Sequence, residues 1–315
     1  MNVDELVTHY VAFRRTLGEK CKTNESILRS FCRAVGSQTS ITHIGAEVVS
    51  AFLNGSGSVT SGWFKKHQAL KGFFRFAIRS GHLIEAPLPK VLPKPPPPFV
   101  PYIYTRDEIR RLLDAIPSSQ DYRTLIEPAT LRAMLLLLYG AGLRVGEALA
   151  LSIADVDLPN ALLTVRDTKF FKSRLVPIGP QLAGVLSEYA RRRTASYPGN
   201  DPGSRFFLGK RGREIQVQTM DGTFERLRDL AGIRRSDGAR YQPRLHDLRH
   251  SAAVHRLIRW YQQGADVQRL LHHLSVYLGH VHIRHTQVYL TMTADLLRQA
   301  GMRFEQYACG EDDHA

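Results

Sequence analysis

The first 85 residues carry apolar side chains at the spacing of amphipathic helices. Four such stripes follow one another, over residues 3–17, 27–35, 48–53 and 63–77. Apolar residues three or four positions apart share one face of a helix, so each stripe predicts a helix with one buried side. The pattern therefore predicts a helical module over residues 1–85.

The last of these stripes interleaves its aromatic residues with lysines and arginines. The aromatic side chains are expected in the core, which leaves the cations on the outer side of the helix. Cations on one helix face are suited to contacting the phosphates of DNA. The candidate DNA-binding residues of this helix are Lys65, Lys66, Lys71 and Arg75.

A proline-rich segment, APLPKVLPKPPPPFVP, follows the helical module at residues 86–101. It holds eight of the 16 prolines in the chain. Proline fixes φ and has no backbone N–H, so the segment is predicted to be a stiff, extended connector. A proline-rich ligand for a partner domain is the alternative, and the helical patterns on both sides favour the connector. The chain is thus divided into residues 1–85, a linker, and residues 102–315.

Helical patterns resume directly after the linker. Thr105 precedes two acidic residues, and acids favour the positive end of a helix dipole, so a helix is predicted to begin there. Residues 131–151 predict one or two buried helices interrupted by Gly140 and Gly142. Residues 219–307 are again mostly helical in pattern.

Short strand patterns lie between these helical regions. Residues 162–167 and 174–178 predict two strands around a short turn. Residues 206–208 and 215–217 predict a second hairpin. The expected fold is therefore mainly α with a small β-sheet, an α+β class.

The charge balance points to a polyanionic partner. The chain has 43 lysines and arginines against 29 acids, a formal net charge of +14. Residues 1–100 contain 13 of these cations against six acids, so both parts of the chain are basic. Nucleic acid is the commonest polyanion in a cell, although a basic protein without such a partner is the alternative.

Cysteine usage and hydropathy indicate the compartment. Three scattered cysteines form neither a disulfide framework nor a paired zinc motif, so a reduced cytoplasmic setting is expected. The chain does not open with a charged start and an apolar stretch, so secretion is not expected. The apolar residues 131–143 are too few to span a bilayer, and no membrane association is expected.

Arg144 is the first residue suited to holding a phosphate. A guanidinium is permanently charged and can donate to two phosphate oxygens at once. Glu147 lies three residues later, on the same face of a helix, where its carboxylate can orient the arginine. An ordinary surface ion pair explains the two residues equally well.

Lys169 lies at the tip of the predicted strand pair, near Lys172 and Arg174. A lysine on a turn can reach into a groove, or donate a proton to an oxygen that leaves phosphorus. A solvated turn lysine is the alternative for Lys169 taken alone. Lys172 and Arg174 are expected to contact backbone phosphates or to remain surface charges.

His246 and Arg249 are three residues apart, so on a helix both project to one side and could hold one phosphate. Histidine titrates near neutrality and can donate or accept a proton there. Either Asp247 or His250 is expected to act as a supporting partner. Polar decoration of a helix N-terminus is the alternative.

Tyr289 lies nine residues after His280. A phenol has a pKa near 10 and is a poor nucleophile unless it is stabilised as phenolate. A pocket with two arginines and a lysine is expected to lower the pKa of Tyr289. His282 and His285 could hold a metal with His280, but no cysteine or acid completes such a site, so neither metal nor cofactor is expected.

Taken together, these residues resemble the catalytic set of the tyrosine recombinases, also called the phage integrase family. The matching text is GAGLRVGEAL at 140–149, TKFFKSRLVPIG at 168–179, LHDLRHSAA at 245–253 and YLGHVHIRHTQVYL at 277–290. The resemblance covers residues 102–307. The helical pattern before the linker is similar to the SAM-like core-binding domain of the family.

The resemblance implies covalent catalysis on DNA. Tyr289 is expected to attack the scissile phosphate and form a 3′-phosphotyrosyl bond. Arg144 and Arg249 are expected to hold the non-bridging oxygens, where negative charge develops. The covalent bond conserves the energy of the phosphodiester, so no nucleotide or metal is required.

The resemblance also implies roles for the remaining residues. Lys169 is expected to be the general acid for the departing 5′-oxygen, His246 to assist proton transfer at the tyrosine, and His280 to hydrogen-bond the phosphate. Glu147 and Asp247 are expected to support these groups.

The family further implies partners. These are double-stranded DNA with specific sites, further copies of the chain as dimers and tetramers on DNA, and sister recombinases. Residues 294–307 are expected to dock on an adjacent protomer, with docking on their own domain as the alternative. A role in a mobile element, in a bacterial cytoplasm and on its nucleoid, is expected.

Two rival functions use the same residues. A type IB topoisomerase shares the tyrosine chemistry without exchanging partners, and the proline linker with its separate helical module argues against it. A catalytically silent DNA-binding regulator is the other rival, and the complete set of catalytic residues argues against that function.

Overall fold

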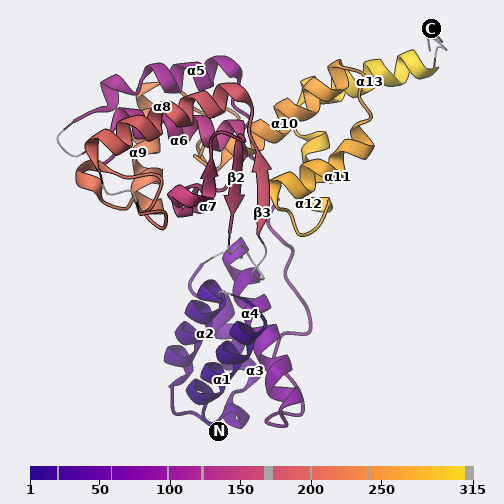
Figure 1. Ribbon diagram of the computed structural model, residues 1–315. Helices are drawn as coiled ribbons and strands as arrows, with labels where there is room; N and C mark the ends of the chain where they lie inside the picture. Colours follow the sequence, from indigo (N-terminus) through magenta and orange to yellow (C-terminus); the bar gives the residue numbers. More distant parts are fainter. Residues whose placement is uncertain are drawn as a thin grey trace. The chain divides into compact units, whose positions relative to one another are not determined.

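A computed structural model describes residues 1–308 except positions 20, 58, 98, 122–123, 167–172, 199–200 and 240. The chain divides into two compact units (Figure 1). The first spans Met1–Phe99, and the second begins at Val100. The division falls near the end of the proline-rich segment.

The first unit contains the four helices that the apolar stripes predict. These are α1 (Val3–Thr16), α2 (Lys22–Val35), α3 (Ala46–Asn54) and α4 (Ser61–Arg79), with a short 3₁₀ turn at Ile41–His43. Their apolar faces meet in a core that buries Phe31, Phe73 and Phe74 completely. Three large aromatic side chains supply much of the apolar area that so small a unit can bury.

Side chains near the first turns fix where two of these helices begin. Asn2 accepts a hydrogen bond from the backbone N–H of Glu5, and the Glu5 carboxylate accepts one from Asn2 in return. Thr60 accepts a hydrogen bond from the N–H of Gly62 at the start of α4. Both contacts satisfy N–H groups that have no partner within the helix.

The second unit is mostly helical. Its helices are α5 (Arg106–Asp114), α6 (Pro128–Gly140), α7 (Val145–Ala150), α8 (Pro180–Ser196), α9 (Val217–Leu230), α10 (Asp247–Gln262), α11 (Val267–Leu278), α12 (Arg284–Gln287) and α13 (Ala294–Ala308). Short 3₁₀ turns lie at Pro117–Ser119, Ile153–Asp155, Lys210–Gly212 and Val288–Thr291. Thr105 and Glu108 cap α5 reciprocally, as the acidic start predicts.

A small antiparallel sheet completes this unit, which confirms the expected mainly α fold with a small sheet. Its strands are β1 (Val156–Asp157), β2 (Leu162–Val165) and β3 (Arg174–Pro177), in the order β1-β2-β3. Leu163 pairs with Val176, and both side chains are buried. The strand pair lies where the alternating pattern predicts it.

The prediction of a second hairpin over residues 206–208 and 215–217 is wrong. A single bridge joins Leu208 to Glu214, and α9 already begins at Val217. Phe206 and Phe207 are buried against Tyr189 of α8, with ring centroids 5.5 and 5.1 Å from its ring. Packing of these aromatic rings, rather than strand pairing, orders this segment.

The sequence patterns also miss helix α8. Pro180 occupies its first turn, where the missing N–H costs nothing. Its apolar positions are few, and its C-terminal half carries three consecutive arginines. Leu186 and Tyr189 nevertheless pack into the core of the second unit.

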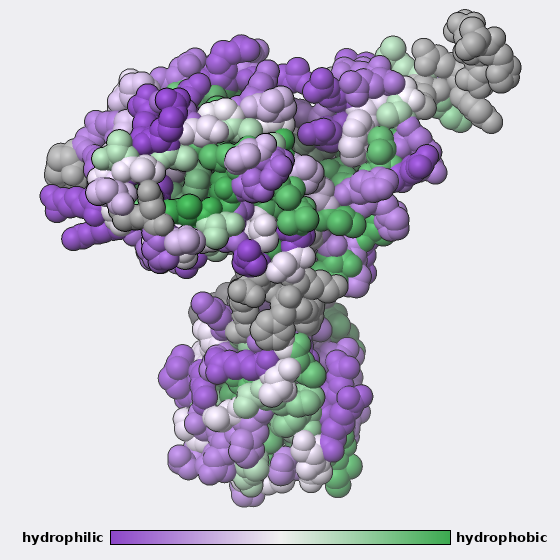
Figure 2. All heavy atoms as spheres, viewed as in Figure 1, coloured by the Kyte–Doolittle hydropathy of each residue, from purple (hydrophilic) through white to green (hydrophobic). Residues whose placement is uncertain are grey.

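Two clusters of apolar side chains form the interior of the second unit. The larger surrounds α6 and the sheet, and the smaller joins α10, α11 and the start of α13. Tyr289 and Leu296 belong to the smaller cluster. Hydrophilic residues cover much of the visible face of each unit (Figure 2). Among the described helices, no apolar stretch reaches the length that a membrane crossing requires.

Candidate active site

The predicted catalytic residues of the second unit converge from three segments. Arg144 lies at the start of α7, and His246 and Arg249 lie at the start of α10. His280 follows α11, and Tyr289 lies in the short 3₁₀ turn after α12. Hydrogen bonds between these segments tie the site together.

Arg144 is held in place while part of its side chain remains open. One guanidinium nitrogen donates to Oε1 of Glu147 at 2.7 Å, and the other donates to the carbonyl of Gly279 at 3.2 Å. The side chain is 40% exposed. A fixed cation with open surface can accept an anionic ligand without rearranging.

Glu147 links two arginines. Its carboxylate also accepts from both terminal nitrogens of Arg174, at 2.8 and 3.2 Å. Burial alone would raise the pKa of Glu147, but hydrogen bonds and charge from Arg174, with the contribution of Arg144, lower that pKa to about 2. Glu147 is therefore ionised and serves as the anionic centre of the site.

Arg174 differs from the phosphate contact or surface charge that the sequence suggests. Its side chain is only 11% exposed, and its Nε donates to the carbonyl of Tyr277 at 3.0 Å. Because both ends of the guanidinium face protein acceptors, Arg174 orients Glu147 instead of presenting charge to a ligand. The sequence gives no sign of this burial, because β3 looks half-exposed in pattern.

Gly279 allows this close packing. Its φ of +68° lies in the left-handed region, and a Cβ there would lie 2.6 Å from a guanidinium nitrogen of Arg174. Only glycine tolerates both conditions without strain. The residue before His280 is therefore fixed by the ion-pair network.

Arg249 is buried between two turns of backbone. Its terminal nitrogens donate to the carbonyls of Gly142 and Leu278, both at 2.5 Å. Burial and then the charge of Arg144 lower its pKa to about 10, so the guanidinium stays charged at neutral pH. The charges of Arg249 and Arg144 both act on Tyr289.

Tyr289 is 2% exposed. Its hydroxyl lies 3.1 Å from Nδ1 of His250. Burial raises the pKa of Tyr289, and the charge and hydrogen bond of Arg249, with the charge of Arg144, only partly oppose that rise. The expectation of a lowered pKa is therefore wrong for the DNA-free protein, because desolvation of the phenolate outweighs the nearby cations.

Two histidines, His250 and His280, lie against the phenol, and His246 packs on the first of them. The ring of His246 meets that of His250 edge-on at 5.0 Å, and the ring of His280 stacks on Tyr289 at 6.0 Å. Nδ1 of His280 is paired with the hydroxyl of Thr286 at 2.8 Å. Burial lowers the pKa of His246 and His250 to about 4, and burial and then Arg249 lower that of His280 to about 3.

His250 is the residue at this site that sequence reasoning underweights. The sequence suggests it only as an alternative to Asp247 for a supporting role, yet its ring nitrogen contacts the hydroxyl of Tyr289 directly. The available signal is its position four residues after His246, which places both rings on one face of α10.

Asp247 supports the start of α10. Its carboxylate oxygens accept from the backbone N–H and the guanidinium of Arg244, at 2.9 and 3.0 Å. The side chain is fully buried. Its supporting contribution is to hold the turn that delivers the histidines.

The remaining predicted residues lie outside this constellation. Lys169 and Lys172 fall outside the described residues. On α4, Lys65, Lys71 and Arg75 are exposed. Lys66 is half-buried, and its ammonium donates to the carbonyl of Phe52 at 2.9 Å.

Within the described part of the chain, no three histidine, cysteine or acidic side chains gather as metal ligands would. The rings of His280 and His282 each lie near that of His285, with centroids 6.0 and 5.8 Å from it. His282 and His285 are exposed.

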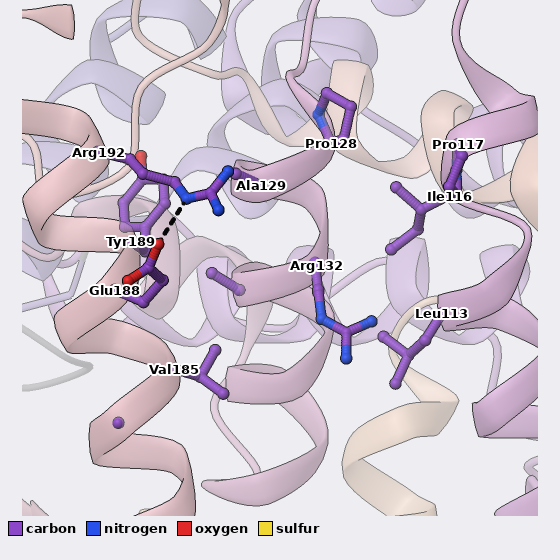
Figure 3. A pocket seen from close by; sticks show the side chains of 12 residues that line it. Leu113, Ile116, Pro117, Pro128, Ala129, Arg132, Val185, Glu188, Tyr189 and Arg192 are labelled. Carbon is purple, nitrogen blue, oxygen red and sulfur yellow. Dashed lines mark hydrogen bonds and ion pairs between the residues drawn. The ribbon is translucent and has the colours of Figure 1, made fainter. Parts of the chain in front are cut away.

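Two cavities of the second unit have none of the predicted catalytic residues in their lining. One, of about 510 Å³, is lined by α5, α6 and α8, with Arg132, Glu188 and Arg192 at its edge (Figure 3). It contains none of the predicted catalytic residues. The other, of about 410 Å³, has among its lining residues Gly142 and Leu278, whose carbonyls accept hydrogen bonds from Arg249.

Known proteins resemble this chain along most of its length. Residues 103–295 match the family model of the phage integrase family. The chain is 35% identical over 306 residues to a protein of Sinorhizobium fredii named as an integrase/recombinase, y4rB. This match covers 96% of each chain. It is 34% identical over 237 residues to tyrosine recombinase XerA of Thermococcus onnurineus, covering 74% of this chain and 71% of the relative.

A solved structure also resembles the whole chain. It is the Tn1549 transposon integrase in complex with transposon right end DNA, with a TM-score of 0.69 and 18% identity. The match covers 98% of this chain and 100% of the integrase. At that identity the match concerns the fold.

Proposed function

Because this chain belongs to the phage integrase family of tyrosine recombinases, we propose that it cuts and rejoins DNA strands at specific sites through a covalent bond to Tyr289. The observation that carries the proposal is the placement of one phenol beside His250 and two arginines, Arg249 and Arg144. Phosphoryl transfer requires this combination of nucleophile, proton acceptor and fixed cations.

The proposed reaction exchanges one ester for another. The Tyr289 oxygen forms a bond to phosphorus, and the bond from phosphorus to the 5′-oxygen breaks. Arg144 and Arg249 stabilise the charge on the non-bridging oxygens. Lys169 supplies a proton to the leaving 5′-oxygen, and His280 hydrogen-bonds the phosphate. A 5′-hydroxyl from a second strand then reverses the step and rejoins the DNA.

DNA binding must move the nucleophile. The phenol of Tyr289 is buried in the DNA-free protein, so its oxygen cannot meet a phosphate without local motion. The short turn that carries it, Val288–Thr291, follows a helix of only four residues, α12. Such short elements rearrange at low cost compared with α10.

We propose that the first unit is a DNA-binding domain and that each unit contacts DNA. The support is the row of exposed cations on α4, where Lys65, Lys71 and Arg75 point to solvent. Lys66 and Lys172 are proposed as further phosphate contacts. Phosphate contacts of this kind give affinity and orientation without reading sequence.

We propose that the later part of α13 docks on a neighbouring protomer in dimers and tetramers on DNA. Leu296, near the start of the helix, is completely buried in its own domain. Leu297, Met302 and Phe304 are 51%, 50% and 71% exposed. Exposed apolar side chains of this size mark a contact surface. A second copy or a sister recombinase would supply the covering face.

We propose that the chain serves a mobile element in a bacterial cytoplasm, and the 35% identical relative named as an integrase/recombinase supports this role. The test uses a pool of nicked duplexes with a randomised core, because the target sequence is unknown. A nick near the cleavage point lets the cut end diffuse away and traps the covalent adduct. The wild-type protein is expected to retain one family of sequences through strong denaturant, and Tyr289→Phe is expected to retain none.

Two further outcomes separate the rivals. Relaxation of supercoiled plasmids that lack the selected sequence would identify a topoisomerase. Specific DNA binding without any adduct would identify a silent regulator.

A further inference from the structure

Two histidines of α10 each contact a tyrosine through the same ring nitrogen. Nδ1 of His250 lies 3.1 Å from the Tyr289 hydroxyl, and Nδ1 of His255 lies 2.8 Å from the Tyr139 hydroxyl. The second pair joins α6 to α10 and involves none of the catalytic residues. The first pair involves the proposed nucleophile, so it carries a chemical consequence that the second does not.

The other two histidines of the site are arranged for different contacts. Nδ1 of His280 is engaged with the Thr286 hydroxyl, and its ring stacks on the ring of Tyr289 at an angle of 29°. The ring of His246 lies against His250. Across the described residues, the ring nitrogen paired with the Tyr289 hydroxyl belongs to His250.

We propose that His250 is a catalytic residue that takes the proton of Tyr289 as the hydroxyl attacks phosphorus, a role that rests on the function proposed above. In the tautomer with hydrogen on Nε2, the hydroxyl donates to Nδ1. As the bond from Oη to phosphorus forms, the proton moves to Nδ1. The departing 5′-oxygen takes a different proton, from Lys169. Rejoining returns the first proton to the phenol oxygen.

The electrostatic surroundings keep His250 in its accepting form. Burial and then the charge of His246 lower the pKa of His250 to about 4, with Asp247 opposing them and Arg244 and Arg249 adding to them. At neutral pH the imidazole is therefore uncharged and Nδ1 can accept a proton. Tyr289, from the turn packed against α10, is the titratable group that faces this nitrogen.

His250 is a weaker base than the phenolate of Tyr289. This difference in basicity determines when the proton moves. Transfer to His250 alone is unfavourable, because the pKa of Tyr289 is raised and that of His250 is lowered. It becomes favourable as the phenol oxygen bonds to phosphorus and loses its basicity. The negative phosphate also favours an imidazolium beside it.

The proposal is tested by the single-turnover rate of adduct formation on the duplex that the wild-type protein selects. His250→Asn keeps an amide near the position of Nδ1 but cannot take up a proton. His255→Asn is the matched control, since it removes the same kind of tyrosine contact from the same helix. His250→Asn is expected to slow adduct formation by about 10²- to 10⁴-fold, and His255→Asn to leave the rate near that of the wild type.

Two measurements separate proton acceptance from a structural role. A 5′-bridging phosphorothiolate provides a leaving group that needs no proton, so the His250→Asn defect is expected to persist while a Lys169→Ala defect disappears. The rate of His250→Asn is also expected to rise about tenfold per pH unit above neutrality, as the phenolate fraction grows, whereas the wild-type rate stays nearly flat.

Each contrary outcome has a definite meaning. A His250→Asn rate equal to that of the wild type, an equal loss in His255→Asn, or a defect abolished by the phosphorothiolate would overturn the role of His250. A full loss in His246→Asn with none in His250→Asn would assign the proton to the other histidine. If the wild-type protein itself formed no adduct, the proposed recombinase function would be wrong. A defect, or the lack of one, in the His250 variant tests only the role of His250.

Discussion

The arginines and the tyrosine of the site are held in opposite ways. Arg249 keeps its charge inside the protein because two backbone carbonyls surround it. Arg144 is held by Glu147, whose carboxylate accepts a hydrogen bond from it and is ionised. Tyr289, in contrast, is buried, uncharged and hydrogen-bonded to a neutral imidazole.

This difference shows how the site can bind before it reacts. The two arginines proposed to hold the phosphate lie at the starts of α7 and α10, and the pKa of Arg249, about 10, keeps it charged at neutral pH. Tyr289, the proposed nucleophile, has a raised pKa and lies on a turn of four residues. The positive charges of the arginines are therefore fixed by the folded protein. Negative charge on the Tyr289 oxygen is expected to develop only when a phosphate is in place. Four variants test this contrast.

The largest effect is expected at Arg249. Arg249→Lys keeps a positive charge but loses the planar guanidinium, whose two terminal nitrogens donate to the carbonyls of Gly142 and Leu278 at once. The rate of adduct formation is expected to fall by about 10³-fold, since a preorganised charge on the phosphate is lost. Arg259→Lys, at an exposed position of the same helix, is the control and should react normally. Equal rates for both variants would contradict the binding role of Arg249.

The next effect is expected at Glu147. Its folded-state pKa of about 2 lies below the ordinary value of 4.5, so its ionisation stabilises the fold above pH 4.5, and this stability is lost as pH falls toward 2. The shift corresponds to about 3 kcal/mol. Urea unfolding of Glu147→Gln is expected to show a loss of this order at pH 7 that shrinks at pH 3. A loss independent of pH would indicate packing instead of charge.

Substitution of Gly279 is expected to lower the free energy of unfolding by a smaller amount, and Gly264 provides a closely matched control. Gly279→Ala adds strain at φ +68° and places a methyl group 2.6 Å from the Arg174 guanidinium, whereas Gly264→Ala adds similar strain at φ +67° with open space around it. Both are expected to lose about 1 kcal/mol of unfolding free energy from backbone strain. Only Gly279→Ala should also slow adduct formation, because Arg174 and then Glu147 must shift. Identical rates in the two variants would argue against this coupling.

The smallest effects are expected on the first unit. Replacing Lys65, Lys71 and Arg75 by alanine should weaken binding to unrelated duplex DNA. The slope of log affinity against log salt should fall by about 0.9 for each lost phosphate contact. Lys22→Ala with Arg33→Ala, on exposed positions of α2, provides the control. A salt slope that the triple variant leaves unchanged would remove α4 from the DNA interface.

Sequence patterns predict the parts of the molecule that depend on local periodicity. The four helices of the first unit and the strand pair follow from apolar spacing. Helix α8 is missed because its apolar residues are diluted by glycine and by three consecutive arginines. The false hairpin at residues 206–217 arises because Phe206 and Phe207 look like strand residues, although contacts with Tyr189 place them in the core.

The site divides in the same way. Motif spacing identifies Arg144, Arg249 and Tyr289, and the structure brings all three together. Arg174 contacts Glu147, and His250 contacts Tyr289. Both contacts are between residues far apart in sequence, so no local sequence pattern predicts them. The direction of the pKa shift of Tyr289 depends on desolvation, which only the packed structure reveals.

The bond between DNA and one phenol is the central claim, and peptide mapping tests it most directly. The adduct trapped on the nicked duplex is digested with protease and nuclease, and the modified peptide is sequenced by mass spectrometry. The account predicts a nucleotide attached through its 3′-phosphate to Tyr289. Attachment to any other residue, or an adduct of equal yield from Tyr289→Phe, would contradict it.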